Sequence, residues 1–285
     1  MSTNNTPVYK ELDGKVAVIT GAGRHQGLGE AMAKRLASEG VKVVITDIGK
    51  ASGSHMPENA IGSQSEMQQI VDEIRQDGGE AECFVCNMLE ASDVEAAAQF
   101  AVDTYGSLDI WVNNAGIGYI MNAIVDMPDD DWDAVLGVNL RGVFLGTKYA
   151  ARVMLKHGIK GKIINIGSQA SKSAFAHASA YTASKHGVVG LTRVAAMELG
   201  EHGINVNTIC PNHVTTGLGA WQNSHFSDVT GKGYEKYMAD MRARIPMGRP
   251  GLQQDIAKAC AFLCSNEASY ITGECMNVSG GEEYH

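Results

Sequence analysis

Short apolar runs and amphipathic segments alternate along almost the whole chain. The runs have the length of buried strands and cover residues 15–20, 41–46, 81–86, 108–112, 162–166, 204–209 and 275–278. Segments with apolar positions three and four residues apart predict helices over residues 30–39, 66–77, 91–105, 131–157, 181–201 and 255–263. Strands that alternate with helices of this length predict an α/β fold, a doubly wound parallel sheet with helices on both faces.

Three stretches stand outside this alternation. Residues 1–12 are polar and aperiodic, and they predict a flexible extension before a single domain over residues 13–285. Residues 48–65 are rich in Gly, Ser and Asn, which is typical of an inserted surface loop. Residues 217–245 combine aromatic, Met and Gly residues, which favours a mobile segment that covers a pocket.

The composition and net charge disfavour some classes of binding partner. The chain of 285 residues is 44% hydrophobic and 19% charged, with a net charge of -9. A negative charge disfavours nucleic acid and anionic membranes, because both bind basic surfaces. No apolar run is long enough to span a bilayer, and the first five residues lack the features of a signal peptide. We therefore expect a cytoplasmic protein.

The cysteines and histidines form no pattern typical of a disulfide framework or a metal site. The six cysteines are scattered through apolar segments. Cys83 and Cys86 have C-x-x-C spacing, but alternation along a strand would send their thiols to opposite faces. The nine histidines include no H-E-x-x-H and no clustered ligand set, so we expect no bound metal.

A glycine-rich loop over residues 21–29 joins the first predicted strand to a helix. Glycines allow close approach to a pyrophosphate, and the free N–H groups of a helix N-terminus attract the anion. Asp47 follows the second strand and can accept both ribose hydroxyls of an adenosine, although it could also cap a turn. Asn87 and Asn114 follow two further strands, at the edge where doubly wound sheets bind ligands.

Tyr181 and Lys185 lie four residues apart on a predicted helix, and therefore on one face. An ammonium beside a phenol lowers the pKa of the phenol, which would make Tyr181 a general base. A shift of the tyrosine pKa from about 10 to near 7 requires about 4 kcal/mol, so a second positive charge or a hydrogen bond is needed. A pair with this spacing also arises by chance.

Two other polar residues accompany this pair. Ser168 follows the strand 162–166 and precedes Tyr181 by thirteen residues. Asn139 lies in the apolar stripe of the helix predicted over residues 131–157. A buried amide needs partners, so Asn139 either satisfies core backbone groups or serves a site.

Together these residues resemble the short-chain dehydrogenase/reductase family, classical type, from about residue 15 to residue 281. The motifs that carry the resemblance are Thr20-Gly21 with Gly27-Leu28-Gly29, Asn113-Asn114-Ala115-Gly116, Asn139, Ser168, Tyr181 with Lys185, and residues 211–216. The resemblance implies a Rossmann-type, dinucleotide-binding catalytic domain. It also implies reversible hydride transfer between a nicotinamide dinucleotide and an alcohol or carbonyl.

The resemblance assigns roles to four catalytic residues. Tyr181 would exchange a proton with the substrate oxygen, and Ser168 would hydrogen-bond the same oxygen. Lys185 would lower the pKa of Tyr181 and hold the nicotinamide ribose. Asn139 would hold a water that links Lys185 to bulk solvent. The positive charge of the oxidised nicotinamide would be the second cation that Tyr181 requires.

The resemblance also implies a set of cofactor-binding residues, which are Gly21, Arg24, Gln26, Gly27, Leu28, Asp47, Ile48, Asn87, Met88, Asn114, Ala115, Gly116, Tyr181, Lys185, Pro211, Val214 and Thr216. Three positions depart from the family pattern. The glycine loop is two residues longer, around residues 24–26. Asn87 replaces an aspartate, although its amide oxygen can still accept from the adenine amine. Asn212 replaces a glycine, and Asn tolerates a left-handed backbone there.

Asp47 favours NAD(H) over NADP(H). Its carboxylate would face the 2′-phosphate, and two like charges about 4 Å apart cost up to ~4 kcal/mol at an effective dielectric of 20. Arg24 is the counter-argument, because its guanidinium could pair with that phosphate.

The predicted substrate-binding residues are Ser168, Gln169, Tyr181, His213 and Trp221, and Tyr119, His177 and Phe226 are further candidates for the pocket wall. They supply aromatic area and hydrogen-bonding groups without clustered Arg or Lys. This favours a neutral or singly charged, partly apolar secondary alcohol or ketone, such as a cyclic one. Alternatively, Trp221 and Phe226 only pack the covering segment onto the body.

Two other functions stay open, an enoyl or C=C reductase of the same fold and a nucleotide-sensing regulator without catalysis. The regulator is disfavoured because Asn139, Ser168, Tyr181 and Lys185 are all present. The resemblance further implies a homotetramer, in which the helices 131–157 and 181–201 would pack against their copies.

Overall fold

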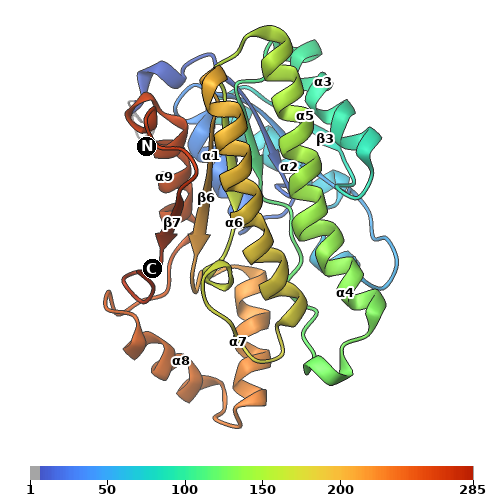
Figure 1. Ribbon diagram of the computed structural model, residues 1–285, viewed down its shortest axis with the longest axis vertical. Coiled ribbons are helices and arrows are strands. Elements are labelled where there is room, and N and C mark those ends of the chain that lie inside the picture. Colours follow the sequence, from blue (N-terminus) through green and yellow to red (C-terminus); the bar gives the residue numbers. More distant parts are fainter. Residues whose placement is uncertain (1–6, 285) are drawn as a thin grey trace.

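Within residues 7–284, which the computed structural model describes, seven parallel strands form one central sheet (Figure 1). Their order is β3-β2-β1-β4-β5-β6-β7. The strands are β1 (Val16–Thr20), β2 (Lys42–Asp47), β3 (Ala81–Val85), β4 (Ile110–Asn113), β5 (Lys162–Ile166), β6 (Asn205–Pro211) and β7 (Cys275–Val278). Each predicted strand overlaps one of these, and the doubly wound parallel sheet is confirmed.

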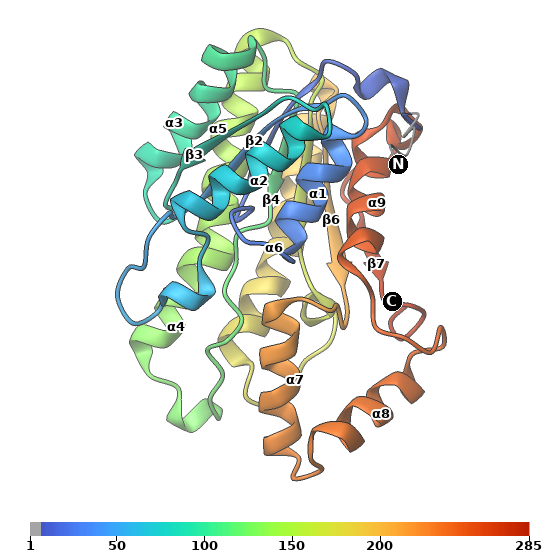
Figure 2. The same cartoon turned by 180° about the vertical axis from the view of Figure 1, so that it is seen from behind.

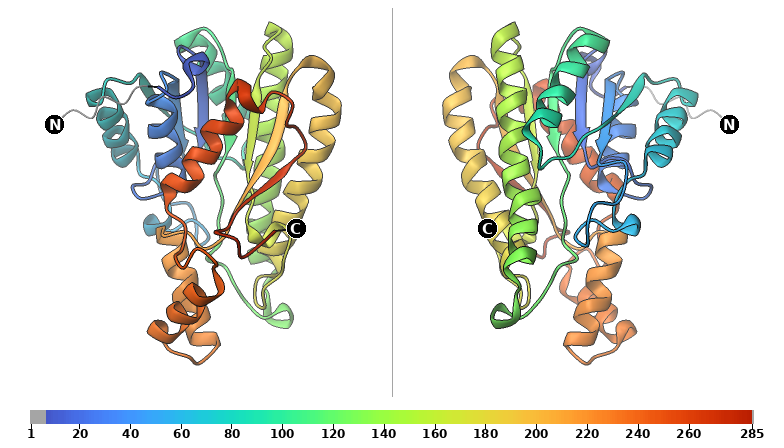
Figure 3. Two further views of the ribbon diagram at one scale, coloured as in Figure 1. Left: turned by 90° about the vertical axis from the view of Figure 1, so that its left-hand side faces the viewer. Right: turned by 90° about the vertical axis from the view of Figure 1, so that its right-hand side faces the viewer.

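Helices cover both faces of the sheet, so the molecule has three layers when it is seen edge-on (Figure 3). The face nearer the viewer in Figure 2 carries α1 (Leu28–Ala37), α2 (Gln64–Gln76) and α9 (Gln253–Cys264). The opposite face carries α3 (Ala91–Tyr105), α5 (Gly142–His157) and α6 (Ser179–Leu199). Short 3-10 helices include Ile124–Asp126, Gln169–Ser171, Gly200–His202 and Asn266–Ala268.

The covering of both faces explains why the central strands are apolar at every position. All residues of β1 and β5 are buried, because neither face of a parallel sheet of this kind contacts water. Ile19 belongs to the core beneath α1 and its neighbour Val18 to the core beneath α3. Cys83 and Cys86 follow the same rule, since Cys83 packs against the first core and Cys86 lies in the second.

The start of the chain is more firmly held than its polar sequence predicts. A short 3-10 helix, Lys10–Leu12, buries Leu12 in the first core. The Tyr9 amide donates to Glu39 Oε2 at 2.7 Å, and Glu11 accepts from the Asn266 amide at 2.9 Å. The predicted flexible extension is therefore wrong for residues 9–12, because one apolar side chain and two carboxylates anchor them. Residues 1–6 lie outside the described residues.

The helix predicted over residues 131–157 is present without a break and contains a π turn. It consists of α4 (Asp129–Leu136), the π turn Gly137–Arg141 and α5. The turn carries Asn139, which is fully buried. A π turn inserts an extra residue into a helix and changes the direction of the side chains that follow. The predicted helix is therefore confirmed, and the π turn inside it is the feature that the apolar period did not show.

The two unusual segments differ in their structure. Residues 217–245 form two helices, α7 (Gly217–Val229) and α8 (Tyr234–Arg244), which project below the carboxyl ends of the strands (Figure 1). The predicted loop 48–65 is irregular apart from a short 3-10 turn, Glu58–Ala60, and α2 begins at its end. Among the described residues, no helix is long and apolar enough to cross a membrane.

Candidate active site

A cavity of about 660 Å³ opens at the carboxyl ends of the strands. It is bordered by the segments that follow β1, β2, β4, β5 and β6, and by α7. The sheet order reverses between β1 and β4, and ligands of doubly wound sheets bind at such a switch point. All seventeen residues predicted to bind the cofactor line this cavity. The folded chain therefore brings the predicted set together.

The glycine loop packs so closely against adjacent backbone that two of its positions have no room for a side chain. Gly21 has a φ of +62°, and a Cβ there would lie 2.6 Å from the Cα of Ala115. A Cβ at Gly29 would lie 2.6 Å from the Cα of Ala22. No side chain caps the first turn of α1, whose N-cap is Gly27, so its N–H groups stay free for an anion. The loop fits a dinucleotide pyrophosphate.

The residues that lengthen this loop are held by hydrogen bonds. Gln26 has a left-handed backbone with a φ of 59°, and its amide donates to Glu30 Oε2 at 2.6 Å. The His25 amide donates to Glu66 Oε1 at 2.8 Å, and the Gln26 carbonyl accepts from Gln253 at 3.0 Å. These contacts leave Arg24 lining the cavity.

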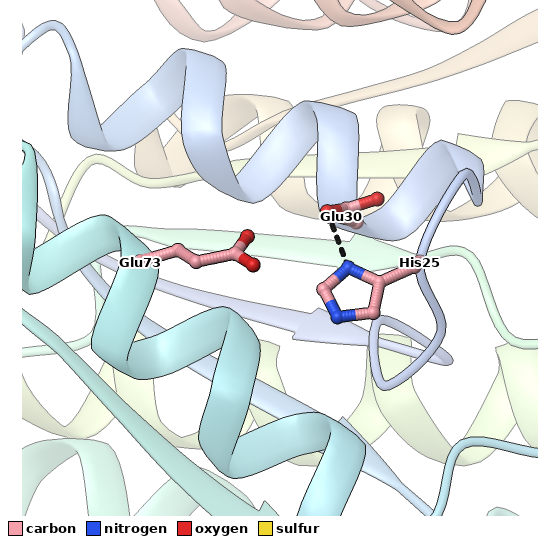
Figure 4. A group of neighbouring side chains, drawn as sticks. All are labelled: His25, Glu30 and Glu73. Carbon is pink, nitrogen blue, oxygen red and sulfur yellow. Dashed lines mark hydrogen bonds and ion pairs between the residues drawn. The ribbon is translucent and has the colours of Figure 1, made fainter.

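A charged cluster braces the same loop (Figure 4). His25 Nδ1 lies 2.9 Å from Glu30 Oε1, and this hydrogen bond raises the pKa of His25. The ligand atoms of His25, Glu30 and Glu73 all lie within 4.8 Å of one another. The Lys34 ammonium already joins the two carboxylates, with distances of 2.7 Å to each. The positive charge between these two carboxylates is therefore supplied by Lys34 rather than by a metal ion.

The Asp47 carboxylate lies at the end of β2, as predicted, and accepts three backbone N–H groups. Oδ1 accepts from Ile48 at 2.9 Å and from Gly62 at 3.1 Å, and Oδ2 accepts from Gly23 at 3.1 Å. Burial raises the pKa of this carboxyl, and the backbone hydrogen bonds oppose the rise. A carboxylate has about four acceptor sites, so Oδ2 retains capacity for a ribose hydroxyl. The turn-capping and ribose-binding interpretations are therefore compatible.

The two asparagines at strand ends have structural partners. The Asn114 side chain donates to the carbonyls of Thr20 and Gly21, both at 2.8 Å, and so ties β4 to the glycine loop. Asn87 Oδ1 accepts from the Leu89 amide at 3.1 Å. Its amide oxygen, predicted to accept from adenine, therefore already has one donor and keeps one acceptor site.

Tyr181, Ser168 and Lys185 meet in the cavity below β5. Ser168 follows the strand, and its amide donates to Ser171 Oγ at 3.1 Å, which fixes the turn. Ser168 and Tyr181 both line this part of the cavity, and Ser168 lowers the pKa of the Tyr181 phenol. Lys185 Nζ lies 5.7 Å from the centroid of the Tyr181 ring and donates to the Ile166 carbonyl at 2.7 Å. This arrangement can exchange a proton with an oxygen bound beside Ser168 and Tyr181.

Asn139 does not line the cavity, and its amide pairs with a backbone unit. Oδ1 accepts from the Ile117 amide and Nδ2 donates to the Ile117 carbonyl, both at 2.8 Å. Nδ2 also lies 3.3 Å from Ser184 Oγ. A Cβ on Gly116 would lie 3.2 Å from Asn139 Oδ1 and 3.8 Å from Lys185 Nζ, so Asn139 is close to the lysine. It satisfies a buried backbone unit next to the site.

Comparisons with known proteins agree with this geometry. Residues 21–283 match a family model described as enoyl-(acyl carrier protein) reductase. The chain is 39% identical to the mitochondrial borneol dehydrogenase of Lavandula x intermedia, over 96% of this chain and 92% of that protein. It is 36% identical to the cyclohexanol dehydrogenase of Acinetobacter sp. (strain SE19), over 95% of each. A crystal structure of a variant actinorhodin polyketide ketoreductase with NADPH is similar, with a TM-score of 0.84, 33% identity and coverage of 100% of both chains.

The chain belongs to the short-chain dehydrogenase/reductase family. One expectation about this short-chain dehydrogenase/reductase needs correction. The expected lowering of the Tyr181 pKa is wrong for the protein's own groups, because burial raises the pKa of the phenol while Ser168 opposes the rise. Burial also lowers the pKa of Lys185 to about 8. A buried pair of this kind disfavours both charged forms.

Asn212, which replaces a glycine of the family pattern, does not have a left-handed backbone, since Gln26 and His177 are the non-glycine residues with positive φ among residues 7–284. Its side chain donates to Glu282 Oε2 at 2.5 Å. Asn212 therefore ties the end of β6 to the C-terminal segment.

The substrate end of the short-chain dehydrogenase/reductase differs from the predicted wall. Gln169, His213 and Phe226 line the cavity, but Trp221 does not. Trp221 stacks on His225 with ring centroids 5.3 Å apart and meets Tyr119 edge-on at 6.4 Å. The substrate-contact prediction for Trp221 is thus replaced by the packing alternative, because its ring packs on His225 and Tyr119. Tyr119 and His177 also do not line the cavity.

Several residues of the cavity wall were missed from the sequence. Arg244 and Glu282 line its substrate end, and Met56 and Ile61 of the inserted loop also line the cavity. Glu282 follows β7, so the strand-end rule that identified Asp47 could have found it. Arg244 and the loop residues carry no local signal. Arg244 adds one guanidinium to the wall predicted from the sequence.

Proposed function

We propose that this short-chain dehydrogenase/reductase transfers a hydride between NAD(H) and a secondary alcohol or ketone with a partly apolar, cyclic frame. The observation that carries the proposal is that Ser168, Tyr181 and Lys185 share one cavity with the glycine loop and Asp47. An acid/base group, an anion site and a ribose acceptor in one cavity are what such a reaction requires.

The chain's own residues supply the proton chemistry. In the reductive direction the Ser168 hydroxyl and the Tyr181 phenol both donate hydrogen bonds to the substrate carbonyl oxygen. As negative charge develops there, Tyr181 gives up its proton, and the Lys185 ammonium stabilises the phenolate that forms. The nicotinamide supplies or accepts the hydride when the cofactor is bound. In the oxidative direction Tyr181 takes the proton back.

The cofactor preference rests on Asp47. Its carboxylate lines the nucleotide end of the cavity with one acceptor site unused. A 2′-phosphate at that position would face this negative charge, whereas a ribose hydroxyl would donate to it. Arg24 lines the same region and is the group that could reverse the preference.

The substrate preference rests on the wall of the cavity. Phe175, Leu218 and Phe226 supply apolar surface beside the reacting groups. The relatives named cyclohexanol dehydrogenase and borneol dehydrogenase act, by their names, on cyclic alcohols. Both points favour a cyclic secondary alcohol or its ketone.

A second candidate is reduction of a C=C bond. The description of the matching family model, enoyl-(acyl carrier protein) reductase, favours it. The placement of Ser168 and Tyr181 in one cavity favours carbonyl chemistry, because both hydroxyls can then bind one oxygen.

A cofactor-coupled screen tests the proposal. Absorbance of the reduced nicotinamide is followed with NAD and NADP against cyclohexanol, bicyclic alcohols, 3-oxoacyl thioesters and an enoyl thioester. We expect turnover of cyclic alcohols with NAD. Turnover of the enoyl thioester alone would establish the second candidate. Tight cofactor binding without turnover of any compound would indicate a nucleotide-sensing regulator.

A further inference from the structure

Three segments that are distant in the sequence bring two charged side chains and an imidazole to the substrate end of the cavity. Arg244 ends α8, Glu282 follows β7 and His213 follows β6, and all three line the cavity. Figure 1 shows the C-terminal segment between the end of β7 and α8. The Arg244 Nε donates to Glu282 Oε1 at 3.0 Å. Glu282 Oε2 accepts from Asn212 at 2.5 Å and lies 3.8 Å from His213 Nε2.

Most N–H donors of the Arg244 guanidinium have no protein acceptor among the described residues. A guanidinium has five N–H donors, and Glu282 accepts the one on Nε. Among residues 7–284, no hydrogen bond joins either Nη group to a protein acceptor. The side chain is half exposed, at 50%, whereas that of Glu282 is 13% exposed. Glu282 therefore fixes the stem of the guanidinium and leaves its outer N–H groups available.

The wall formed by these groups carries little net charge. The Glu282 carboxylate compensates the Arg244 guanidinium at 3.0 Å. Burial lowers the pKa of His213, an effect that Glu282 opposes and Arg244 reinforces, so its imidazole is neutral at pH 7. An incoming carboxylate would gain Arg244 but face Glu282 at close range. A neutral oxygen acceptor meets the free N–H groups without that penalty.

We infer that Arg244, held by Glu282 and flanked by His213, binds a second neutral oxygen of the substrate. The inference rests on the proposed function, in which Ser168 and Tyr181 bind the reacting oxygen. The substrate class is then a cyclic ketone or alcohol that carries another carbonyl or hydroxyl across an apolar frame, which packs against Phe226. Diketones and hydroxyketones belong to this class.

Matched substrate pairs test the inference. Cyclohexane-1,4-dione is compared with cyclohexanone, and a decalindione with the corresponding decalone, because the two sizes sample different separations of the oxygens. The wild-type enzyme is expected to prefer at least one dione at least tenfold in kcat/KM, after correction for its two equivalent carbonyls. A hydrogen bond to a charged group has about this strength. 4-Oxocyclohexanecarboxylate should be a poorer substrate than the dione.

Variants of α8 distinguish binding of the second oxygen by Arg244 from general effects on folding and activity. Arg244→Met should remove the preference for the dione and leave kcat/KM for the monoketone within about threefold of wild type. Arg242→Met is the matched control, since Arg242 lies on the same helix, is exposed and does not line the cavity. Arg244→Lys retains a cation for Glu282 without the guanidinium fork, and it should lose most of the preference even if Arg244→Met does not fold.

The outcomes distinguish two failures. If monoketones are turned over but no dione is preferred, or if Arg244→Met and Arg244→Lys change both substrates equally, the inference is wrong and the proposed function stands. A preference for the carboxylate substrate would also overturn it. If no ketone or alcohol is turned over with either cofactor, the proposed function fails and the inference falls with it.

Discussion

The Lys185 ammonium donates a 2.7 Å hydrogen bond to the carbonyl of Ile166, the last residue of β5. Ser168 follows two residues later, so this contact ties α6 to the strand that delivers the serine. The same ammonium lies 5.7 Å from the centroid of the Tyr181 ring. One backbone carbonyl thus sets the positions of the lysine and, through the helix, of the tyrosine.

Lys185 should make stability depend on pH. Burial lowers the pKa of Lys185 from 10.5 to about 8. Below pH 8 both the folded and unfolded chains keep the proton, whereas between about pH 8 and pH 10.5 the unfolded chain binds more protons. The free energy of unfolding should therefore rise with pH in this window, relative to Lys185→Met. Urea unfolding of both proteins without cofactor at pH 7, 8.5 and 10 measures the difference, and a difference that is flat or falls with pH would contradict it.

Tyr181→Phe should abolish turnover while NADH binding stays nearly intact. The substitution removes the hydroxyl that meets Ser168 and keeps the ring that packs beside Lys185. Steady-state assays and NADH fluorescence titration give the two readouts. Tyr149→Phe, on α5 and outside the cavity, is the matched control and should keep wild-type activity. A residual kcat above a tenth of wild type would show that another group transfers the proton.

Asp47 should set the cofactor preference. The wild-type enzyme is expected to have a higher kcat/KM with NAD than with NADP, and Asp47→Asn should narrow the ratio about tenfold or more, because the charge that opposes the 2′-phosphate is lost. The variant should also be less stable by about 1–3 kcal/mol, since one backbone N–H loses its acceptor. Equal or better kcat/KM of the wild type with NADP would refute the assignment.

Phe226 and Trp221 should behave differently although both lie on α7. Phe226→Ala should raise KM for a cyclic substrate by roughly tenfold and up to a hundredfold, because Phe226 lines the cavity. Trp221→Ala should leave KM within about twofold and lower the melting temperature, because Trp221 packs on His225 and Tyr119. A raised KM for Trp221→Ala at unchanged stability would restore Trp221 to the substrate wall.

The outer surface of α5 and α6 should form the interface of a homotetramer. Phe144 on α5 and Val194 and Met197 on α6 are 46%, 53% and 83% exposed, and the two helices lie side by side in Figure 1. Light scattering should give about four times the chain mass of 30.3 kDa. The double variant Phe144→Glu with Met197→Glu should lower that mass, whereas Val8→Glu, at a residue 69% exposed near the N-terminus, should not. A monomeric wild type at micromolar concentration would exclude the interface.

Local geometry explains why much of this protein is predictable from its sequence. The period of apolar residues sets whether a segment is a strand or a helix, so the doubly wound sheet follows from the pattern. Parallel strands all end at one edge of the sheet, so the glycine loop, Asp47 and Ser168 are expected to lie together there. The i, i+4 spacing puts Tyr181 and Lys185 on one face because helical backbone geometry is the same in every protein.

Tertiary structure decided what depends on burial and on contacts between distant segments. The pKa directions of Tyr181 and Lys185 follow from burial, which a spacing of four residues does not contain. Arg244 and Glu282 meet only because α8 folds back toward the end of β7. Trp221 does not line the cavity because the orientation of α7 directs Leu218, Gln222 and Phe226 into it instead. Sequence periodicity determined the elements and the strand ends, whereas packing alone determined which side chains enter the cavity and which charges they keep.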